Sequence, residues 1–195
     1  MHSHARIART RGFTLIELLV TIGVVAIMAA LAAPSFRDFI VRKNLESITS
    51  EFSSDIALAR SRAINGNLCV TMCVSSSAAD AAPVCTGGSD WQVGWIVFLN
   101  PTCNSGLTKP QDAGDLLRAR VSKEGEYYLY GQAGAVNKMV FNPRGSPGLS
   151  SASEYDAVYM SSNNPLTLRY AKNICVDALG RTRAIPSESS CTNYK

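Results

Sequence analysis

The sequence predicts an α+β fold in which one long N-terminal helix lies beside an antiparallel β-sheet. An apolar run from Phe13 to Ala33 is long enough for a helix that crosses a membrane. An amphipathic stretch continues this helix to about Ile64. Short segments rich in β-branched and aromatic residues follow, separated by Gly, Pro, Asn and Ser. A helix followed by a run of such strands is typical of an α+β domain.

The apolar run contains one ionisable residue, Glu17, and three arginines precede it: Arg6, Arg9 and Arg11. At about 1.5 Å of rise per residue, the helix would reach about 31 Å, close to the roughly 30 Å of a hydrocarbon core. The arginines place the N-terminus in the cytoplasm and the rest of the chain in the periplasm. A carboxylate at this depth costs about 3 kcal/mol, so we expect Glu17 to meet a partner.

The alternative for this run is an ordinary signal peptide or signal anchor. Secretory apolar segments usually have about 7–15 residues and end in an A-x-A-like cleavage site. This run is longer, and its Gly12–Phe13 junction lies on the cytoplasmic side. Together with Glu17, these features argue against a secretory signal.

The residues Gly12 to Leu18 read G-F-T-L-I-E-L and resemble the N-terminus of a type IV prepilin. The resemblance implies that a prepilin peptidase removes residues 1–12 as a leader and that the new N-terminal residue, Phe13, is methylated. It also implies that Glu17 pairs with the N-terminal amine of a neighbouring subunit during filament assembly. An ammonium group in the same layer would offset much of the cost of the buried carboxylate.

This resemblance implies a protein that is held in the inner membrane before assembly and is part of an extracellular pilus afterwards. Residues 13–33 would form the membrane-spanning and filament-core half of the helix. Residues 34–64 would form its amphipathic half, and residues 65–195 a β-rich globular domain in the periplasm or outside the cell.

The second half of the helix is predicted from Pro34 onward. Proline removes a backbone donor and clashes one turn back, so we expect a kink at Pro34. Apolar residues then recur at steps of three and four: Phe36, Phe39, Ile40, Leu45, Ile48, Phe52, Ile56, Ala59 and Ala63. This stripe predicts a helix that packs against the sheet, and Asn65-Gly66-Asn67 provides its C-terminal stop.

Strands are predicted at Leu68–Val74, Trp91–Leu99, Leu116–Val121, Tyr127–Tyr130, Lys138–Phe141, Ala157–Met160, Leu166–Tyr170 and Ile174–Val176. Loops are expected at Ser75–Asp90, Asn100–Gly114 and Gly145–Ser153. About 160 residues follow the apolar run, which is enough for one domain with its own core. Three aromatic side chains are expected in that core and not in a ligand site: Trp91, Trp95 and Phe98.

Three further stretches resemble the minor-pilin branch known as the FimT/FimU/GspH family. They are Trp91-Gln-Val-Gly-Trp-Ile-Val-Phe, Phe141-Asn-Pro-Arg-Gly and Val176-Asp-Ala-Leu-Gly-Arg-Thr-Arg. The resemblance implies the type IV pilin fold and a minor subunit whose partners are other major and minor pilins. A minor pseudopilin H of a type II secretion system shares the fold and stays open as the alternative. The cysteine pattern and the two long loops are departures that leave the subfamily open.

The six cysteines are an even number in an exported domain and predict up to three disulfides: Cys69, Cys73, Cys85, Cys103, Cys175 and Cys191. We expect Cys175–Cys191 to close the C-terminal segment. Pairs Cys73–Cys85 and Cys69–Cys103 would suit an antiparallel hairpin, although spacing alone does not decide them. No C-x-x-C occurs, and both histidines, His2 and His4, lie in the leader. No metal site or cofactor is therefore predicted.

Charge and residue types also exclude several functions. The net charge is +4, but three of these charges lie in the leader, so the mature chain is nearly neutral and has no global nucleic-acid footprint. The mature chain lacks histidine, and no phosphate loop or nucleophile elbow occurs. We therefore predict that the protein is not an enzyme.

The one candidate binding motif is Gly180-Arg181-Thr182-Arg183. In an extended strand, Arg181 and Arg183 would project from the same face, and Gly180 permits a tight turn before them. Two guanidinium groups on one face suit contact with successive phosphates. Other cations and aromatic residues, the latter able to stack on bases, lie nearby in the sequence: Arg169, Tyr170, Lys172, Tyr194 and Lys195.

The family resemblance adds that a C-terminal G-R-x-R motif of FimT-type minor pilins is implicated in binding DNA during natural transformation. DNA, contacted through its phosphate backbone without base preference, is therefore an expected partner. The alternative is that Arg181 and Arg183 are two solvated residues on an exposed strand.

Overall fold

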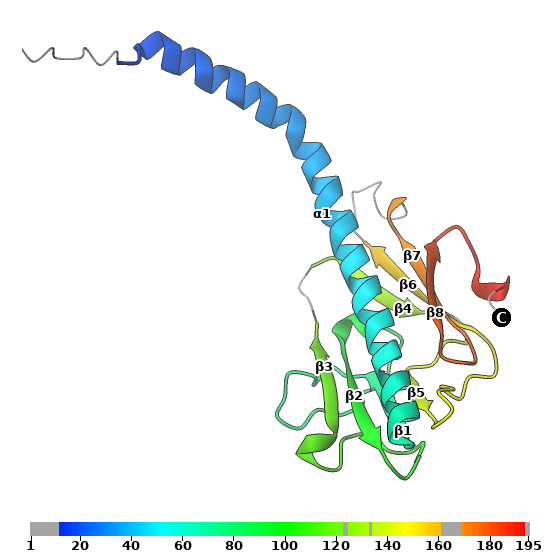
Figure 1. The fold of residues 1–195 in the computed structure, drawn as a ribbon. Coiled ribbons are helices and arrows are strands. Elements are labelled where there is room, and N and C mark those ends of the chain that lie inside the picture. The colour runs from blue at the N-terminus through cyan, green and yellow to red at the C-terminus, as the bar shows by residue number, and fades with distance from the viewer. Residues whose placement is uncertain (1–11, 123–124, 133, 161–168, 194–195) are drawn as a thin grey trace, which may run out of the picture. The chain divides into compact units, whose positions relative to one another are not determined.

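The computed structural model describes residues 12–122, 125–132, 134–160 and 169–193. Among these residues lie the long helix α1 (Leu15–Gly66) and eight strands in two antiparallel sheets (Figure 1). The chain divides into two units, Met1–Ile40 and Val41–Lys195. The second unit contains the later part of α1 together with both sheets. The predicted α+β fold is confirmed.

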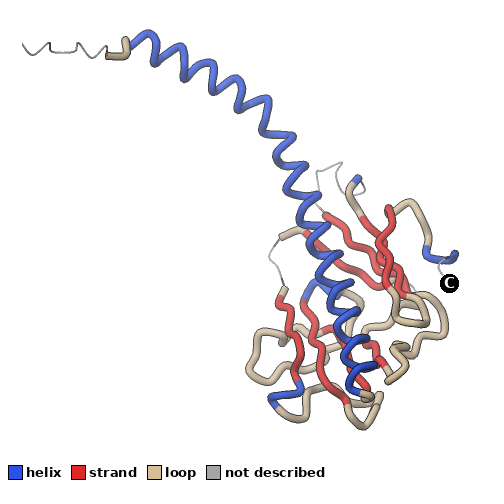
Figure 2. The backbone as a smooth tube through the Cα atoms, in the orientation of Figure 1, coloured by secondary structure: helices blue, strands red, loops and turns tan. Residues whose placement is uncertain are grey.

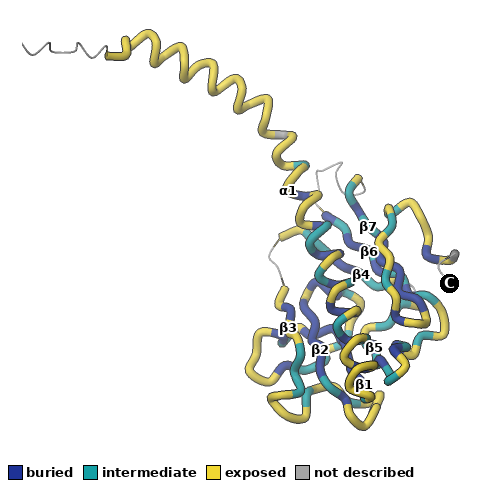
Figure 3. The backbone as a smooth tube through the Cα atoms, viewed as in Figure 1, coloured by how far each residue is buried: buried dark blue, intermediate teal, exposed yellow. Residues whose placement is uncertain are grey.

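The part of α1 in the first unit is apolar and exposed (Figure 3). Within the described residues, α1 is the one helix with an apolar stretch long enough to cross a membrane. The helix is continuous across position 34, and the kink expected at Pro34 stays a prediction. Phe36, Phe39 and Ile40 were expected to pack against the sheet, but they are exposed. The buried stripe of the helix begins only at Val41.

From Val41 onward, the predicted stripe of α1 forms the core with both sheets: Leu45, Ile48, Phe52, Ile56, Ala59 and Ala63 are all buried. The Phe52 ring lies at the centre of this stripe. Its centroid is 5.1 Å from Trp91, 5.5 Å from Trp95 and 5.1 Å from Tyr155, each time edge-on. Rings that meet edge-on gain about 0.5–1.5 kcal/mol per pair beyond the area they bury.

The first sheet has the order β3-β2-β1-β5. Its strands are β1 (Cys69–Val74), β2 (Gly94–Asn100), β3 (Leu116–Val121) and β5 (Lys138–Phe141). Side chains such as Met72 and Trp95 face α1, whereas Ile96 and Phe98 form a second apolar cluster with Ala78 and Leu107 of the two long loops. Figure 2 shows loops, in tan, beside the strands of this sheet. These loops bury the far face of the sheet, so every residue of β1 is buried.

The second sheet has the order β4-β6-β7-β8. Its strands are β4 (Tyr127–Gly131), β6 (Ser153–Tyr159), β7 (Lys172–Val176) and β8 (Thr182–Pro186). Alternate residues of the inner strands, including Tyr155, Ala157 and Ile174, enter the common core. Strand β8 lies at an edge of this sheet, with β7 as its partner.

Three disulfides tie the loops to the sheets: Cys69–Cys103, Cys73–Cys85 and Cys175–Cys191. They are the pairs that the sequence analysis favoured. The first two fasten the long loops to β1. The third fastens the turn at Cys191–Asn193 to β7.

Several strand predictions need correction. Trp91–Val93 is a 3-10 turn capped by the Asp90 carboxylate, and only the later residues of the predicted segment form β2. Strand β6 begins at Ser153, four residues earlier than expected. The strand expected at Leu166–Tyr170 lies mostly outside the described residues, and neither Arg169 nor Tyr170 is in a strand. Strand β8 is absent from the predicted strand ranges, although the G-R-T-R segment at its start was considered as an extended strand. One expected sheet is in fact two.

Candidate functional site

The N-terminal end of α1 is closed by a capping box made by Thr14 and Glu17. The Thr14 hydroxyl accepts a hydrogen bond from the Glu17 backbone N–H at 3.3 Å. The Glu17 carboxylate accepts from the Thr14 backbone N–H at 3.1 Å and from its hydroxyl at 3.0 Å. The sequence T-L-I-E has the S/T-x-x-E pattern of such a cap, a signal that our sequence analysis missed. Glu17 therefore has a partner within its own chain.

The neighbouring residues Gly12 and Phe13 are exposed, with Phe13 84% accessible. A Cβ atom added to Gly12 would meet no atom within 4 Å. Among the described residues, nothing therefore makes a steric demand for glycine at this position. The rest of the predicted leader lies outside the described residues.

The candidate binding motif lies at the turn between β7 and β8. The Gly180 N–H donates to the Asp177 carbonyl at 2.9 Å, and the Asp177 N–H donates to the Arg181 carbonyl at 3.0 Å. Gly180 has φ of +72°, a left-handed conformation. This is the geometry of a type I turn followed by a glycine bulge. The predicted tight turn at Gly180 is thus present.

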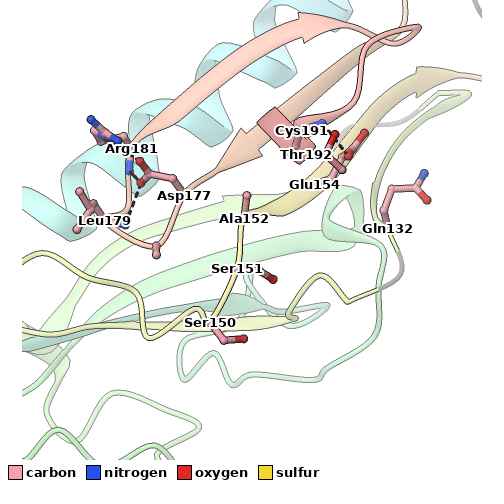
Figure 4. A pocket seen from close by; sticks show the side chains of 11 residues that line it. Gln132, Ser150, Ser151, Ala152, Glu154, Asp177, Leu179, Arg181, Cys191 and Thr192 are labelled. Carbon is pink, nitrogen blue, oxygen red and sulfur yellow. Dashed lines mark hydrogen bonds and ion pairs between the residues drawn. The ribbon is translucent and has the colours of Figure 1, made fainter. Parts of the chain in front are cut away.

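Inside this turn, the residue Asp177 is buried, and its carboxylate accepts three hydrogen bonds (Figure 4). It accepts from the Leu179 N–H at 2.9 Å, from the Arg181 N–H at 2.8 Å and from Arg181 Nε at 2.6 Å. Burial alone would raise the pKa of Asp177, but the donors and charge of Arg181 and the Leu179 amide outweigh it. The pKa of Asp177 is therefore held below its usual value.

The turn is also docked on α1 and on the loop after β5. Arg60 Nε donates to the Leu179 carbonyl at 2.9 Å, and Ser146 Oγ donates to the Ala178 carbonyl at 2.8 Å. A Cβ atom on Gly180 would lie 2.7 Å from the carbonyl oxygen of Gly145. The F-N-P-R-G and G-R-T-R segments thus meet in space. Gly180 and Arg181 have a structural role in this contact.

The predicted cations do not gather into one patch. Arg183 is exposed on β8, opposite Cys175. Lys172 begins β7, so it lies at the other end of that strand from the turn, about 13 Å away at 3.3 Å per residue. Arg169 is stacked over the Tyr170 ring at 5.5 Å. Tyr194 and Lys195 lie outside the described residues.

A cleft of about 660 Å³ lies on the other side of the turn, between β6, loop residues 150–152 and Cys191 (Figure 4). Its carboxylates are already engaged: Glu154 accepts from Asn173 Nδ2 at 2.7 Å and from the Cys191 N–H at 3.2 Å. Among the described residues, no group of three or more Asp, Glu, His or Cys side chains is placed to hold a metal ion. We see no catalytic arrangement in this cleft.

Comparison with known proteins identifies relatives of both parts of the chain. The family described as Type II transport protein GspH matches residues 49–180, and the prokaryotic N-terminal methylation motif matches residues 7–33. A fimbrial protein of Pseudomonas aeruginosa is 36% identical over 56 residues, 29% of this chain and 36% of that protein. The type IV major fimbrial protein FimA of Dichelobacter nodosus is 39% identical over 41 residues, 21% of this chain and 26% of that protein. The chain thus spans about a third or less of the length of these relatives.

The fold is similar to crystal structures of the type IV minor pilin FimU of Pseudomonas aeruginosa. One crystal form gives a TM-score of 0.55 at 16% identity and covers 77% of this chain and 95% of that chain. A second crystal form gives a TM-score of 0.52 at 15% identity and covers 74% of this chain and 94% of that chain. The expected type IV pilin fold is confirmed.

Replacing Gly180 with alanine should destabilise the domain through both the left-handed φ and the contact with Gly145. A suitable control is Gly88→Ala, because Gly88 has φ of +92° but nothing within 4 Å of an added Cβ atom. We expect the free energy of unfolding, measured in urea, to fall by about 1–2 kcal/mol in Gly88→Ala and by clearly more in Gly180→Ala. Equal losses would show that the contact between the two glycines adds nothing.

Replacing Asp177 with asparagine should lower stability at pH 7 by about 1 kcal/mol, because the charge that Arg181 stabilises is lost. Since the pKa of Asp177 is lowered in the folded chain, this contribution is present above the usual carboxyl pKa and disappears as pH falls below it. Thermal unfolding of both forms from pH 7 to pH 2 measures the difference. A difference that stays constant below about pH 4 would contradict this account.

Proposed function

The chain belongs to the GspH family, and from this premise we propose that it is a minor subunit of a type IV pilus that enters the filament through its N-terminal helix. The observation that carries the proposal is the exposed apolar half of α1, which begins with the capped Glu17 and matches the methylation motif. An apolar helix that stays exposed among the described residues needs lipid or other helices around it.

The proposed life of the subunit has two stages. First, residues 13–33 anchor it in the inner membrane, with the N-terminus in the cytoplasm and residues 65–195 in the periplasm. A prepilin peptidase then cleaves after Gly12, Phe13 is methylated, and the helix packs among those of major and minor pilins. The exposed Phe36, Phe39 and Ile40 extend the apolar surface beyond the membrane span and would contact neighbouring helices.

In this proposal Glu17 has a second task, which is to pair with the N-terminal amine of a neighbouring subunit. The capping box supplies a competing explanation, since a cap alone would account for an acidic residue at this position. The two roles differ in what they require. The cap needs a hydrogen-bonding side chain, whereas the pairing needs a negative charge.

Two substitutions separate these roles. Glu17→Gln keeps the capping-box pattern and removes the charge, whereas Thr14→Val removes the cap hydroxyl and keeps the charge. We expect Glu17→Gln to remain in the membrane fraction and to be at least tenfold depleted in sheared pili. Thr14→Val should assemble at near wild-type levels. Immunoblots of both fractions measure the ratio, and normal assembly of Glu17→Gln would overturn the pairing.

The runner-up is the minor pseudopilin H of a type II secretion system, which shares the family and the fold. The sequence similarity to fimbrial proteins of Pseudomonas aeruginosa and Dichelobacter nodosus supports the pilus instead. Deletion of the gene distinguishes the two. Loss of twitching or transformation points to a pilus, and loss of exoprotein release points to secretion.

As a second function, we propose that the subunit binds DNA weakly through Arg181 and Arg183. The observation that favours this is that both lie on the surface at the start of an edge strand, with the Arg181 side chain 51% exposed although it is paired with Asp177. A site with so few cations should bind DNA without base preference, and its affinity should depend strongly on salt concentration.

Combining Arg181→Gln with Arg183→Gln should abolish a mobility shift of DNA by the protein at low salt. The control is Arg42→Gln with Lys109→Gln, which removes the same charge from other exposed positions. We expect the control pair to leave the shift within about twofold of wild type. No shift by the wild type, or equal loss in both pairs, would end the proposal of a DNA site at this turn.

A further inference from the structure

A small cleft lies between the last turns of α1 and the start of β8, on the side of the turn away from the larger cleft. We propose that it is an oxyanion site that takes one phosphate of a nucleic-acid backbone, with Arg60 of α1 as a cation of the site beside Arg181. This inference rests on the proposed DNA binding and deepens it, because Arg60 lies outside the G-R-T-R segment. The cleft has a volume of about 290 Å³.

The lining of the cleft consists of hydrogen-bond donors and apolar groups. Its polar residues are Arg60, Ser61, Asn65, Arg181 and Thr182. Ser61 Oγ accepts from Asn65 Nδ2 at 3.2 Å, so the hydroxyl proton of Ser61 remains available for a ligand. None of the described residues that line the cleft is acidic. A concave surface of this composition favours an anion.

Arg60 is held in place before any ligand arrives. Its side chain lies against one glycine of the loop after β5 and one glycine of the docked turn: an added Cβ atom would lie 3.1 Å from Arg60 Cγ at Gly145 and 3.3 Å from Arg60 Cδ at Gly180. Arg60 Nε donates to the Leu179 carbonyl, its one hydrogen-bond partner among the described residues. The two Nη groups can therefore donate to a phosphate, and little side-chain entropy remains to be lost.

The charges around the cleft explain why Arg60 is needed. Asp177 binds Arg181 Nε at 2.6 Å and offsets much of its charge, so Arg181 alone is a weak attraction for phosphate. The carbonyl end of α1 disfavours an anion. Arg60 adds a second guanidinium, and the local balance becomes positive. Arg183 pairs with Cys175 on the face of the sheet that is turned away from α1, so it is not part of this cleft.

The test measures the fluorescence anisotropy of a labelled 20-nucleotide DNA with the full-length protein in a nonionic detergent. The variant is Arg60→Gln, and the matched control is Arg62→Gln, which removes an exposed cation from the same part of α1 that does not line the cleft. We expect Arg60→Gln to weaken binding about tenfold and to reduce the salt slope by about one. Arg62→Gln should stay within about twofold. Arg60→Lys keeps the charge and should recover part of the affinity.

The outcomes distinguish this inference from the function on which it rests. If the Arg181 and Arg183 variants lose DNA while Arg60→Gln behaves like Arg62→Gln, DNA binding stands and the Arg60 site is overturned. If the wild type binds no DNA, the DNA function fails. The melting temperatures in phosphate and in chloride of equal ionic strength then test whether the cleft binds free phosphate. Stabilisation by phosphate that Arg60→Gln alone loses supports a site for free phosphate. Equal stabilisation of all forms overturns the site.

Discussion

The fold depends on one constraint, which is that a single stripe of α1 must be buried by two sheets at once. Neither four-stranded sheet covers the helix alone, because residues of both enter the same core. Phe52 joins them, since its ring meets Trp91 and Trp95 from one sheet region and Tyr155 from the other. A polar interaction reinforces the contact: the indole N–H of Trp95 donates to the buried Asp55 carboxylate of the helix at 2.7 Å. Once the helix is held in this way, the β7–β8 turn can dock on Arg60.

Periodicity predicted the parts of this fold that depend on local sequence. The stripe from Leu45 to Ala63 and strands β3 and β5 have the predicted residues, because apolar spacing reports which face of an element is buried. The pairing of strands into two sheets was not predicted, since alternation does not say which strand is the neighbour. The exposure of Phe36 was also missed. Apolar spacing there is the same whether the partner is the sheet of one chain or the helix of another.

The candidate binding motif shows how a structural role can account for residues that look functional. Gly180 and Arg181 were predicted as a turn and a ligand for phosphate, and the turn is present. Their contacts with Gly145 and Asp177 could not be predicted from the motif, because they depend on segments that only the fold brings together. The pattern Asp177-Ala-Leu-Gly180 was the local signal for an aspartate-capped turn. A G-R-x-R segment is therefore a weak indication of DNA binding when a neighbouring carboxylate already neutralises one of its arginines.

The disulfides on the loop-covered side of the first sheet have a consequence for how the domain would withstand proteolysis. Cys73 and Cys85 are 12 residues apart in the sequence, and both lie between Cys69 and Cys103, which are 34 residues apart. A protease that cuts the backbone between Cys73 and Cys85 leaves the two pieces joined by both bonds. A cut between Cys85 and Cys103 leaves them joined by one. Because β1 stays paired with β2 and β5 when either cut falls in a loop, a nicked domain can keep its fold.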